Sequence, residues 1–267
     1  MPARPSPAAA ADPSERYVIP NLRNACRILK LLGRTPDGLK GADLARQLGI
    51  PVTTTLRIMS TLTLEGLVRK EYNRYELGPV LIQLGNASLA GTEIGAAALP
   101  VLANLTARTH ETSHLAIPCD DRSLIVAVQD SPHPLRAASR PGFLAALHCS
   151  STGKIFLTHL HGSVLPGLAA RQPLEKLTPR TLVTAAELRR ECALTRQRGY
   201  SLDDEEFAPG VRCLAAPVFS STGMVVAAIG ITAATVRFTK ERIPEMAAHV
   251  QTAAAELSAS LGHGGHS

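Results

Sequence analysis

The sequence predicts an α+β protein of two domains, in which a short basic domain precedes a larger domain with a central antiparallel sheet. Three observations predict this fold class. The 267 residues exceed one minimal module. Helical spacings and one short hairpin fill residues 20–91, whereas strand-like runs flanked by helices fill residues 92–262. The excess of positive charge lies in the first of these two parts.

The first 19 residues are rich in proline and alanine, and we expect them to be disordered. They lack the apolar core of a signal peptide, and no apolar run reaches the ~18 residues of a membrane helix. The five cysteines are scattered without any CxxC pair, which is typical of reduced thiols. We therefore expect a cytoplasmic protein with no membrane partner.

The charge is distributed unevenly along the chain. Residues 21–75 hold ten Lys and Arg against four Asp and Glu, whereas residues 76–267 hold sixteen of each sign. The formal net charge of +6 therefore lies in the predicted N-terminal domain. A basic domain beside a balanced one indicates that one domain meets a polyanion.

The predicted N-terminal domain, residues 20–78, begins with three helices. Apolar residues at helical spacing predict the first helix at residues 21–32. Two more helical patterns flank Gly49, which allows a tight turn, and Pro51, which favours a helix start. The small side chain of Ala45 lets these two helices cross steeply, as in a helix-turn-helix.

The run LVRKEYNRYELG then predicts two strands around Tyr72 and Asn73, and this basic hairpin completes a winged helix-turn-helix. The alternative is a helical hairpin with a solvated basic face, but the hairpin and the localised charge favour DNA binding. The third helix of such a fold enters the major groove, and the hairpin cations contact the backbone or the minor groove. The predicted contacts with double-stranded DNA are Thr53, Thr54, Arg57, Arg69, Lys70 and Arg74.

Residues 79–91 resume helical spacing and predict a linker helix. Helical patterns and strand-like runs then follow one another without strict alternation, which favours an antiparallel sheet. The expected helices are 99–109, 185–200 and 244–261, and the expected strands are 113–118, 122–130, 211–219 and 223–231.

A polar run, HCSSTGK, comes directly before another helical segment. Ser151, Thr152 and Gly153 would there present free backbone N–H groups at a helix N-terminus, an arrangement that binds carboxylates and phosphates. The alternative is an ordinary N-cap that serves only its own helix.

Four stretches resemble the IclR family of bacterial transcriptional regulators: GADLARQLGIPVTTTLRIMSTL, YELG, LHCSSTGK and GYSLDDEEFAPGVRCLAAPVF. The resemblance covers about residues 20–260. It implies a DNA-binding N-terminal domain, a GAF-like C-terminal domain that binds a small effector, and homodimers or homotetramers on a palindromic operator. It also implies that the effector contacts Ser151, Thr152, Asp203, Cys213, Gly230 and Thr232.

Two positions depart from the family pattern. Gly230 stands where a serine is often found, which removes a hydrogen-bond donor. Thr55 stands where the helix-turn-helix usually buries Val or Ile, and we expect its hydroxyl to bond a carbonyl of its own helix.

The run of four acids at residues 203–206 has several interpretations. As an acid/base pair or a metal cradle it lacks a designated nucleophile and a tight ligand spacing, so we expect no catalytic residue, metal or cofactor. We expect Asp204, Glu205 and Glu206 in a charged loop or helix start. An enzyme, or a thiol or metal sensor, that uses Cys149 and Cys213 stays open as an alternative.

The sequence thus favours one hypothesis above the others. It predicts a DNA-binding transcriptional regulator, not an enzyme, whose C-terminal domain binds a small organic acid that changes its affinity for the operator.

Overall fold

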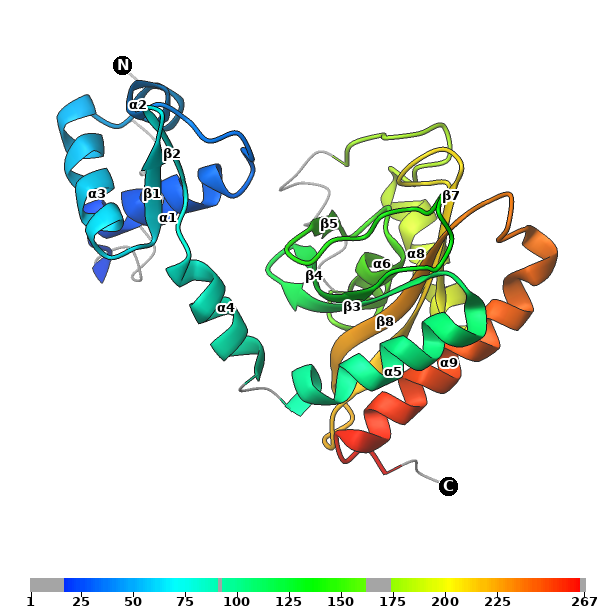
Figure 1. The fold of residues 1–267 in the computed structure, drawn as a ribbon. Coiled ribbons are helices and arrows are strands. Elements are labelled where there is room, and N and C mark those ends of the chain that lie inside the picture. The colour runs from blue at the N-terminus through cyan, green and yellow to red at the C-terminus, as the bar shows by residue number, and fades with distance from the viewer. Residues whose placement is uncertain (1–16, 91–92, 162–173, 265–267) are drawn as a thin grey trace, which may run out of the picture. The chain divides into compact units, whose positions relative to one another are not determined.

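The computed structural model describes residues 17–90, 93–161 and 174–264. Residues 1–16, most of the stretch expected to be disordered, lie outside the described residues. The chain divides into two compact units between Ser88 and Leu89 (Figure 1). No helix in the described ranges combines the length and the apolar character needed to cross a membrane.

The first unit contains the three predicted helices and the hairpin. In chain order these elements are α1 (Pro20–Leu32), α2 (Gly41–Leu48), α3 (Val52–Leu64), β1 (Val68–Glu71) and β2 (Arg74–Leu77). Gly49 ends α2 with a left-handed φ of 65°, and its N–H donates to the Ala45 carbonyl oxygen. The winged helix-turn-helix is therefore confirmed. Its core holds Ile28, Leu32, Leu44, Ile50, Ile58, Met59, Leu62, Val68 and Tyr75.

Thr55 differs from its expectation. It is fully buried on the face of α3 that also carries Ile58, Met59 and Leu62. Within the described residues, its hydroxyl oxygen has no hydrogen-bond partner, so the expected bond to a helix carbonyl is not formed. The hydroxyl is enclosed by the domain instead of being satisfied by its own helix, and this buried polar group costs stability.

The helix α4 (Val80–Ala90) follows the hairpin, and the second unit then alternates less regularly between helices and strands. Its helices are α5 (Glu93–Thr109), α6 (Ser151–His159), α8 (Ala185–Arg198), the short η2 (Lys240–Arg242) and α9 (Ile243–Ser260). Its strands are β3 (Thr112–Cys119), β4 (Arg122–Gln129), β5 (Leu144–Ala146), β6 (Ser201–Asp204), β7 (Val211–Phe219) and β8 (Val225–Ala234). They form one curled antiparallel sheet in the order β5-β4-β3-β8-β7-β6, which confirms the α+β class.

Helices cover both faces of this sheet (Figure 1). Ile229 and Ile231 of β8 pack in a cluster with residues of α5 and α9, whereas Ala228 packs in a second cluster with residues of α6 and α8. Because successive strand residues point to opposite faces, Gly230 and Thr232 lie on the face toward α6. Most of the predicted effector contacts lie on this face of the sheet or at the start of α6, which packs against it.

Candidate DNA-binding and effector sites

The exposed face of α3 carries the predicted DNA contacts. Thr53 and Arg57 are exposed and lie one helical turn apart, and Thr54 is half-buried. Leu56 is 48% exposed on the same side of the helix. The helix therefore presents hydroxyl, apolar and cationic groups together, which suits contact with base edges and phosphates.

The hairpin, or wing, turns at Tyr72 and Asn73 as predicted, with φ of 43° and 65° at the two residues. Two of its three predicted cations are already engaged within the protein. Arg69 donates from Nε and Nη2 to Glu76 at 3.1 and 2.7 Å, and Arg74 donates to the Gly38 carbonyl oxygen at 2.9 Å.

Lys70 differs from both arginines. Its Nζ lies 5.5 Å from the centre of the Tyr75 ring, and no carboxylate of the described residues pairs with it. Of the three wing cations, Lys70 therefore has the fewest contacts within the protein that a DNA phosphate would have to replace.

The predicted effector contacts on the sheet lie together. The strand register places Asp203 of β6 opposite Cys213 of β7, and Cys213 opposite Thr232 of β8. Gly230 lies in the neighbouring cross-strand row, opposite Ala215. The structure therefore brings Asp203, Cys213 and Thr232 into one row across three strands.

The N-terminus of α6 lies against this part of the domain. The Ser151 carbonyl oxygen accepts a hydrogen bond from Ser201 of β6 at 2.6 Å. Thr152 Oγ1 accepts one from Ser123 of β4 at 2.7 Å. Both residues are about 2% exposed, so the helix start is fixed against β4 and β6.

The expectation of a free N–H at Gly153 is wrong. Ser150 is the N-cap of α6, and its Oγ accepts from the Gly153 N–H at 3.1 Å. A Cβ at Gly153 would also lie 2.6 Å from the Ala146 carbonyl oxygen. Gly153 therefore permits close packing of the helix start, and the cap already uses its N–H.

Gly230 is likewise required by packing. A Cβ there would lie 2.3 Å from the Leu214 carbonyl oxygen of the neighbouring strand β7. The close approach of the two strands therefore explains why this chain has glycine and not serine at position 230.

Lys154 was missed by the sequence analysis and organises the acidic run. Its side chain is 1% exposed, and its ammonium group donates to Glu206 at 2.5 Å and to the Leu202 carbonyl oxygen. Glu191 lies 3.4 Å from the same nitrogen. Glu206 lies in the loop after β6, as expected, but Lys154 holds its carboxylate inside the domain.

Two more acids of the run are also engaged. Asp203 is 1% exposed and accepts from the backbone N–H groups of Glu206 and Phe207 at 2.8 and 3.2 Å. Asp204 belongs to strand β6 and pairs with Arg212 at 2.5 Å, so its assignment to a loop or helix start is wrong. Glu205 begins the turn after β6, with a φ of 63°, and Glu206 follows it in the same loop.

Burial dominates the acid–base properties of this region. It raises the pKa of Asp203 to about 6, although Lys154 and the two backbone N–H groups act in the opposite direction. It also raises the pKa of Glu206 to about 7, against the attraction of Lys154. Both carboxyl groups can therefore take up a proton near neutral pH.

The two cysteines considered as nucleophiles or sensors are protonated at neutral pH. Burial raises the pKa of Cys149 to about 12 and that of Cys213 well above its ordinary value. The described part of the chain contains no group of three or more His, Cys, Asp or Glu placed to hold a metal ion. A thiolate nucleophile or sensor therefore has no support in this environment.

Two further polar residues reach the row. His114 of β3 and Ser139, between β4 and β5, lie 3.4 and 3.3 Å from Thr232 Oγ1. Burial lowers the pKa of His114 to about 4, so the ring is neutral. Spacing could not reveal either residue, because each is far from Thr232 in the chain.

Six of the seven predicted effector residues are buried, and Cys213 is partly buried. None of the seven residues lines either of two cavities, of about 580 and 320 Å³, that the domain contains. The smaller cavity is lined by Leu147 and His148, just before the cap of α6, and by Phe207, whose N–H bonds Asp203. The smaller cavity therefore borders residues that are next to the predicted effector site.

Comparison with known proteins bears on both domains. Residues 22–71 match the IclR helix-turn-helix domain, and residues 86–259 match the bacterial transcriptional regulator IclR C-terminal domain. The chain is 32% identical over 260 residues to the transcriptional repressor IclR of Escherichia coli (strain K12). This alignment covers 96% of this chain and 94% of that protein.

Solved structures agree with this assignment. An IclR transcriptional regulator from Alicyclobacillus acidocaldarius has a TM-score of 0.82 at 28% identity, over 92% of this chain and 100% of that one. An IclR homologue from Microbacterium hydrocarbonoxydans, complexed with 4-hydroxybenzoate, shares the fold with a TM-score of 0.77 at 21% identity, over 90% and 98% of the chains. The relatives are transcription regulators and not enzymes. The helix-turn-helix unit and the effector-binding unit of this chain therefore make it a member of the IclR family of bacterial transcriptional regulators.

Proposed function

We propose that this regulator binds a small organic acid between the N-terminus of α6 and the polar row of the sheet, and that the acid changes its affinity for a palindromic operator. The row of Asp203, Cys213 and Thr232 beneath the start of α6 carries the proposal. With the start of α6, the row gathers polar groups from four elements of the domain in one place.

The chemistry of the row favours a carboxylate. Asp203, with its pKa of about 6, becomes a hydrogen-bond donor when it takes up a proton. Thr232 and Ser151 add hydroxyl donors, and the start of α6 adds the positive end of a helix dipole. The bound 4-hydroxybenzoate of the Microbacterium homologue is an acid of this class.

Because most residues of the site are buried, the acid needs a route of entry. We propose the cavity of about 320 Å³ beside His148 and Phe207 as this route. Because Phe207 donates its N–H to Asp203, a shift of the turn after β6 would open the cavity and alter the row together. We assign this turn to the entrance of the site.

The response on DNA follows from geometry. In a homodimer or homotetramer in the cytoplasm, two α3 helices with Thr53, Thr54 and Arg57 occupy half-sites about one helical turn, or a multiple of it, apart. A change in their spacing alters operator affinity, and such couplings are typically about 1–3 kcal/mol. Lys70, Arg69 and Arg74 contribute salt-dependent affinity from the wing.

The proposal is tested by fluorescence anisotropy with DNA from beside the protein's own gene and with random DNA of equal length. We expect preferential binding to the first DNA that persists as salt rises, and a shift of this affinity by one or more acids of a carboxylate panel. Thr232→Val should remove the shift and leave DNA binding intact, whereas Thr252→Val, at an exposed threonine of α9, should leave both intact. Operator affinity that no acid changes would contradict the effector part of the proposal.

A further inference from the structure

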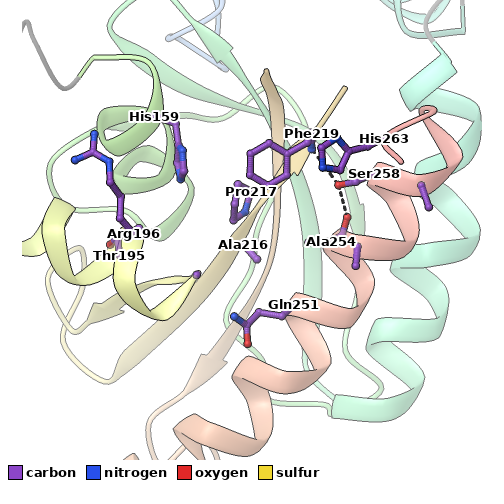
Figure 2. A pocket seen from close by; sticks show the side chains of 13 residues that line it. His159, Thr195, Arg196, Ala216, Pro217, Phe219, Gln251, Ala254, Ser258 and His263 are labelled. Atoms are coloured by element: carbon purple, nitrogen blue, oxygen red, sulfur yellow. Dashed lines mark hydrogen bonds between the residues drawn. The ribbon is translucent and has the colours of Figure 1, made fainter. Parts of the chain in front are cut away.

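The second half of β7 forms an open edge of the sheet. Strand β6 pairs with β7 only from Asp204 opposite Arg212 to Ser201 opposite Ala215. Beyond Ala215, no strand of the described residues covers β7 on that side. The cavity of about 580 Å³ lies there, between α6 and α8 on one side and α9 on the other (Figure 2). We call it the edge groove.

The lining of the edge groove is apolar along its length and aromatic at one end. Ala216 and Pro217 of β7 form its floor, and small residues of α9, including Ala254 and Ala255, form a wall (Figure 2). The Phe219 ring stacks on the His263 ring with centroids 5.2 Å apart, and it forms a T-shaped pair with the His159 ring with centroids 6.0 Å apart. This surface suits an aromatic or aliphatic group about the size of a small ligand.

Among the described residues that line the edge groove, Arg196 on α8 carries the one permanent charge, and none is acidic. The Arg196 guanidinium donates to the Thr158 carbonyl oxygen at 2.5 Å, and no carboxylate of the described chain pairs with it. Burial and the nearby Arg196 charge lower the pKa of His159, which keeps its ring neutral. The groove therefore has a net attraction for an anion.

The edge groove also has a polar group without a hydrogen-bond partner among the described residues. Thr195, beside Arg196, is 1% exposed, and within the described residues its hydroxyl oxygen forms no hydrogen bond. A buried hydroxyl of this kind gains from any ligand atom that can bond it. Thr195 and Arg196 thus mark the polar end of the groove.

The open edge does not suit the addition of another strand. Pro217 has no N–H group, and the Phe219 N–H already donates to Ser258 Oγ at 3.0 Å. The Ser258 hydroxyl in turn donates to the Ala254 carbonyl oxygen at 2.6 Å (Figure 2). With its donors absent or used, the edge offers side-chain surface and not a template for a peptide strand.

We propose that the edge groove is a second ligand site of this regulator, for a monocarboxylate with an apolar body. The carboxylate pairs with Arg196 and bonds Thr195, and the body lies over Pro217 along the alanines of α9 toward Phe219. None of the predicted effector residues lines this groove, so the two sites are separate and the inference does not depend on the first.

Isothermal titration calorimetry of the full chain tests the site, with octanoate and benzoate as probes and octanol and benzyl alcohol as their neutral counterparts. We expect saturable binding of at least one acid, about tenfold tighter than its alcohol. Arg196→Gln should weaken it by about tenfold, and Ala255→Phe should abolish it by filling the groove. Arg190→Gln and Ala248→Phe, at exposed positions of the same helices outside the groove, and Thr232→Val in the effector site should bind like the wild type.

Several results would overturn the proposal. Neither acid binding saturably at millimolar concentration, or binding that Arg196→Gln leaves unchanged, would remove the site. Loss of binding in Thr232→Val would place the acid in the effector site instead. A smaller assembly for Ala255→Phe in analytical ultracentrifugation, without acid binding by the wild type, would assign the groove to a contact between copies of the chain. If Ala255→Phe fails to fold, the exposed Arg196→Gln and its Arg190→Gln control decide the matter alone.

Discussion

At the scale of single residues, the clearest consequence concerns the unpartnered hydroxyl of Thr55 in the core of the first unit. Thr55→Val keeps the shape and removes the hydroxyl, so the free energy of unfolding of this unit should rise by about 1 kcal/mol. Hydrogen exchange of α3 peptides measures this, because the readout is confined to one of the two units.

Thr61 on the same helix is the matched control for that prediction. Its hydroxyl is exposed and donates to the Arg57 carbonyl oxygen at 3.1 Å, so Thr61→Val removes a satisfied group. We expect a change within about 0.5 kcal/mol. Equal protection of the α3 amides in both variants would show that the Thr55 hydroxyl carries no cost.

The second residue-scale prediction concerns Asp203 and pH. Its pKa of about 6 lies above its ordinary value, and an acid bound beside it is favoured by the protonated form, which donates a hydrogen bond and carries no charge. Effector affinity should therefore be high below the pKa and should fall by up to about tenfold per pH unit above it. Calorimetric titrations between about pH 5 and 8 measure this slope.

Asp203→Asn should flatten the slope. The amide keeps an oxygen for the N–H groups of Glu206 and Phe207 and offers its NH₂ as a permanent donor. Asp120→Asn, in the exposed turn between β3 and β4, should keep the wild-type slope. The same slope in both variants would show that Asp203 is not the group that titrates.

At the scale of elements, the sequence predicted the helices and strands in which the spacing of apolar residues matches the buried face. The pattern of α3 and the long apolar runs of β7 and β8 carry their fold signal locally. Strand β6 could not be predicted in this way, because two of its four residues are aspartates. Their charges are compensated by Lys154 and Arg212, which only the folded chain brings to them.

The candidate site likewise combines residues that could be predicted from the sequence with residues that only the fold brings there. Resemblance to the family indicated Asp203, Cys213 and Thr232, and the register unites them. It did not indicate His114, since its role depends on the pairing of β3 with β8. The N–H of Gly153 was mistaken for a ligand contact because the local pattern of an N-cap is the same as that of an anion site.

The two elements that meet DNA should contribute differently. Arg57 on α3 is exposed and forms no ion pair with a described residue, whereas Arg69 on the wing is held by Glu76. Arg57→Ala should cost about 1–3 kcal/mol of operator affinity, and Arg69→Ala less than about 1 kcal/mol. Anisotropy titrations with operator and random DNA measure both losses, and equal losses would contradict the assignment of α3 as the reading element.

Arg46 on α2 provides the control for these cations. It is exposed and pairs with Asp43 on its own helix at 2.7 Å. Arg46→Ala removes one positive charge from the same unit without touching α3 or the wing. We expect it to change operator affinity by less than either DNA-facing variant.

At the scale of the whole molecule, α4 is the element across which the two units are joined, since their boundary falls at Ser88 within its residues. If the effector changes DNA binding through a continuous helix, breaking α4 should abolish the coupling and spare each binding event. Gly85 is exposed on α4, and a Cβ there meets no atom within 4 Å. It therefore accepts substitutions without a clash of its side chain.

Gly85→Pro removes a helix hydrogen bond and clashes with the preceding turn, whereas Gly85→Ala strengthens the helix by about 1 kcal/mol. We expect the proline variant to bind operator and effector separately but to lose the effect of one on the other. The alanine variant should keep it. Because coupling is reciprocal, the factor by which the effector shifts operator affinity must equal the factor by which operator shifts effector affinity. Equal factors in the wild type that persist in Gly85→Pro would show that the signal passes between the units without a continuous α4.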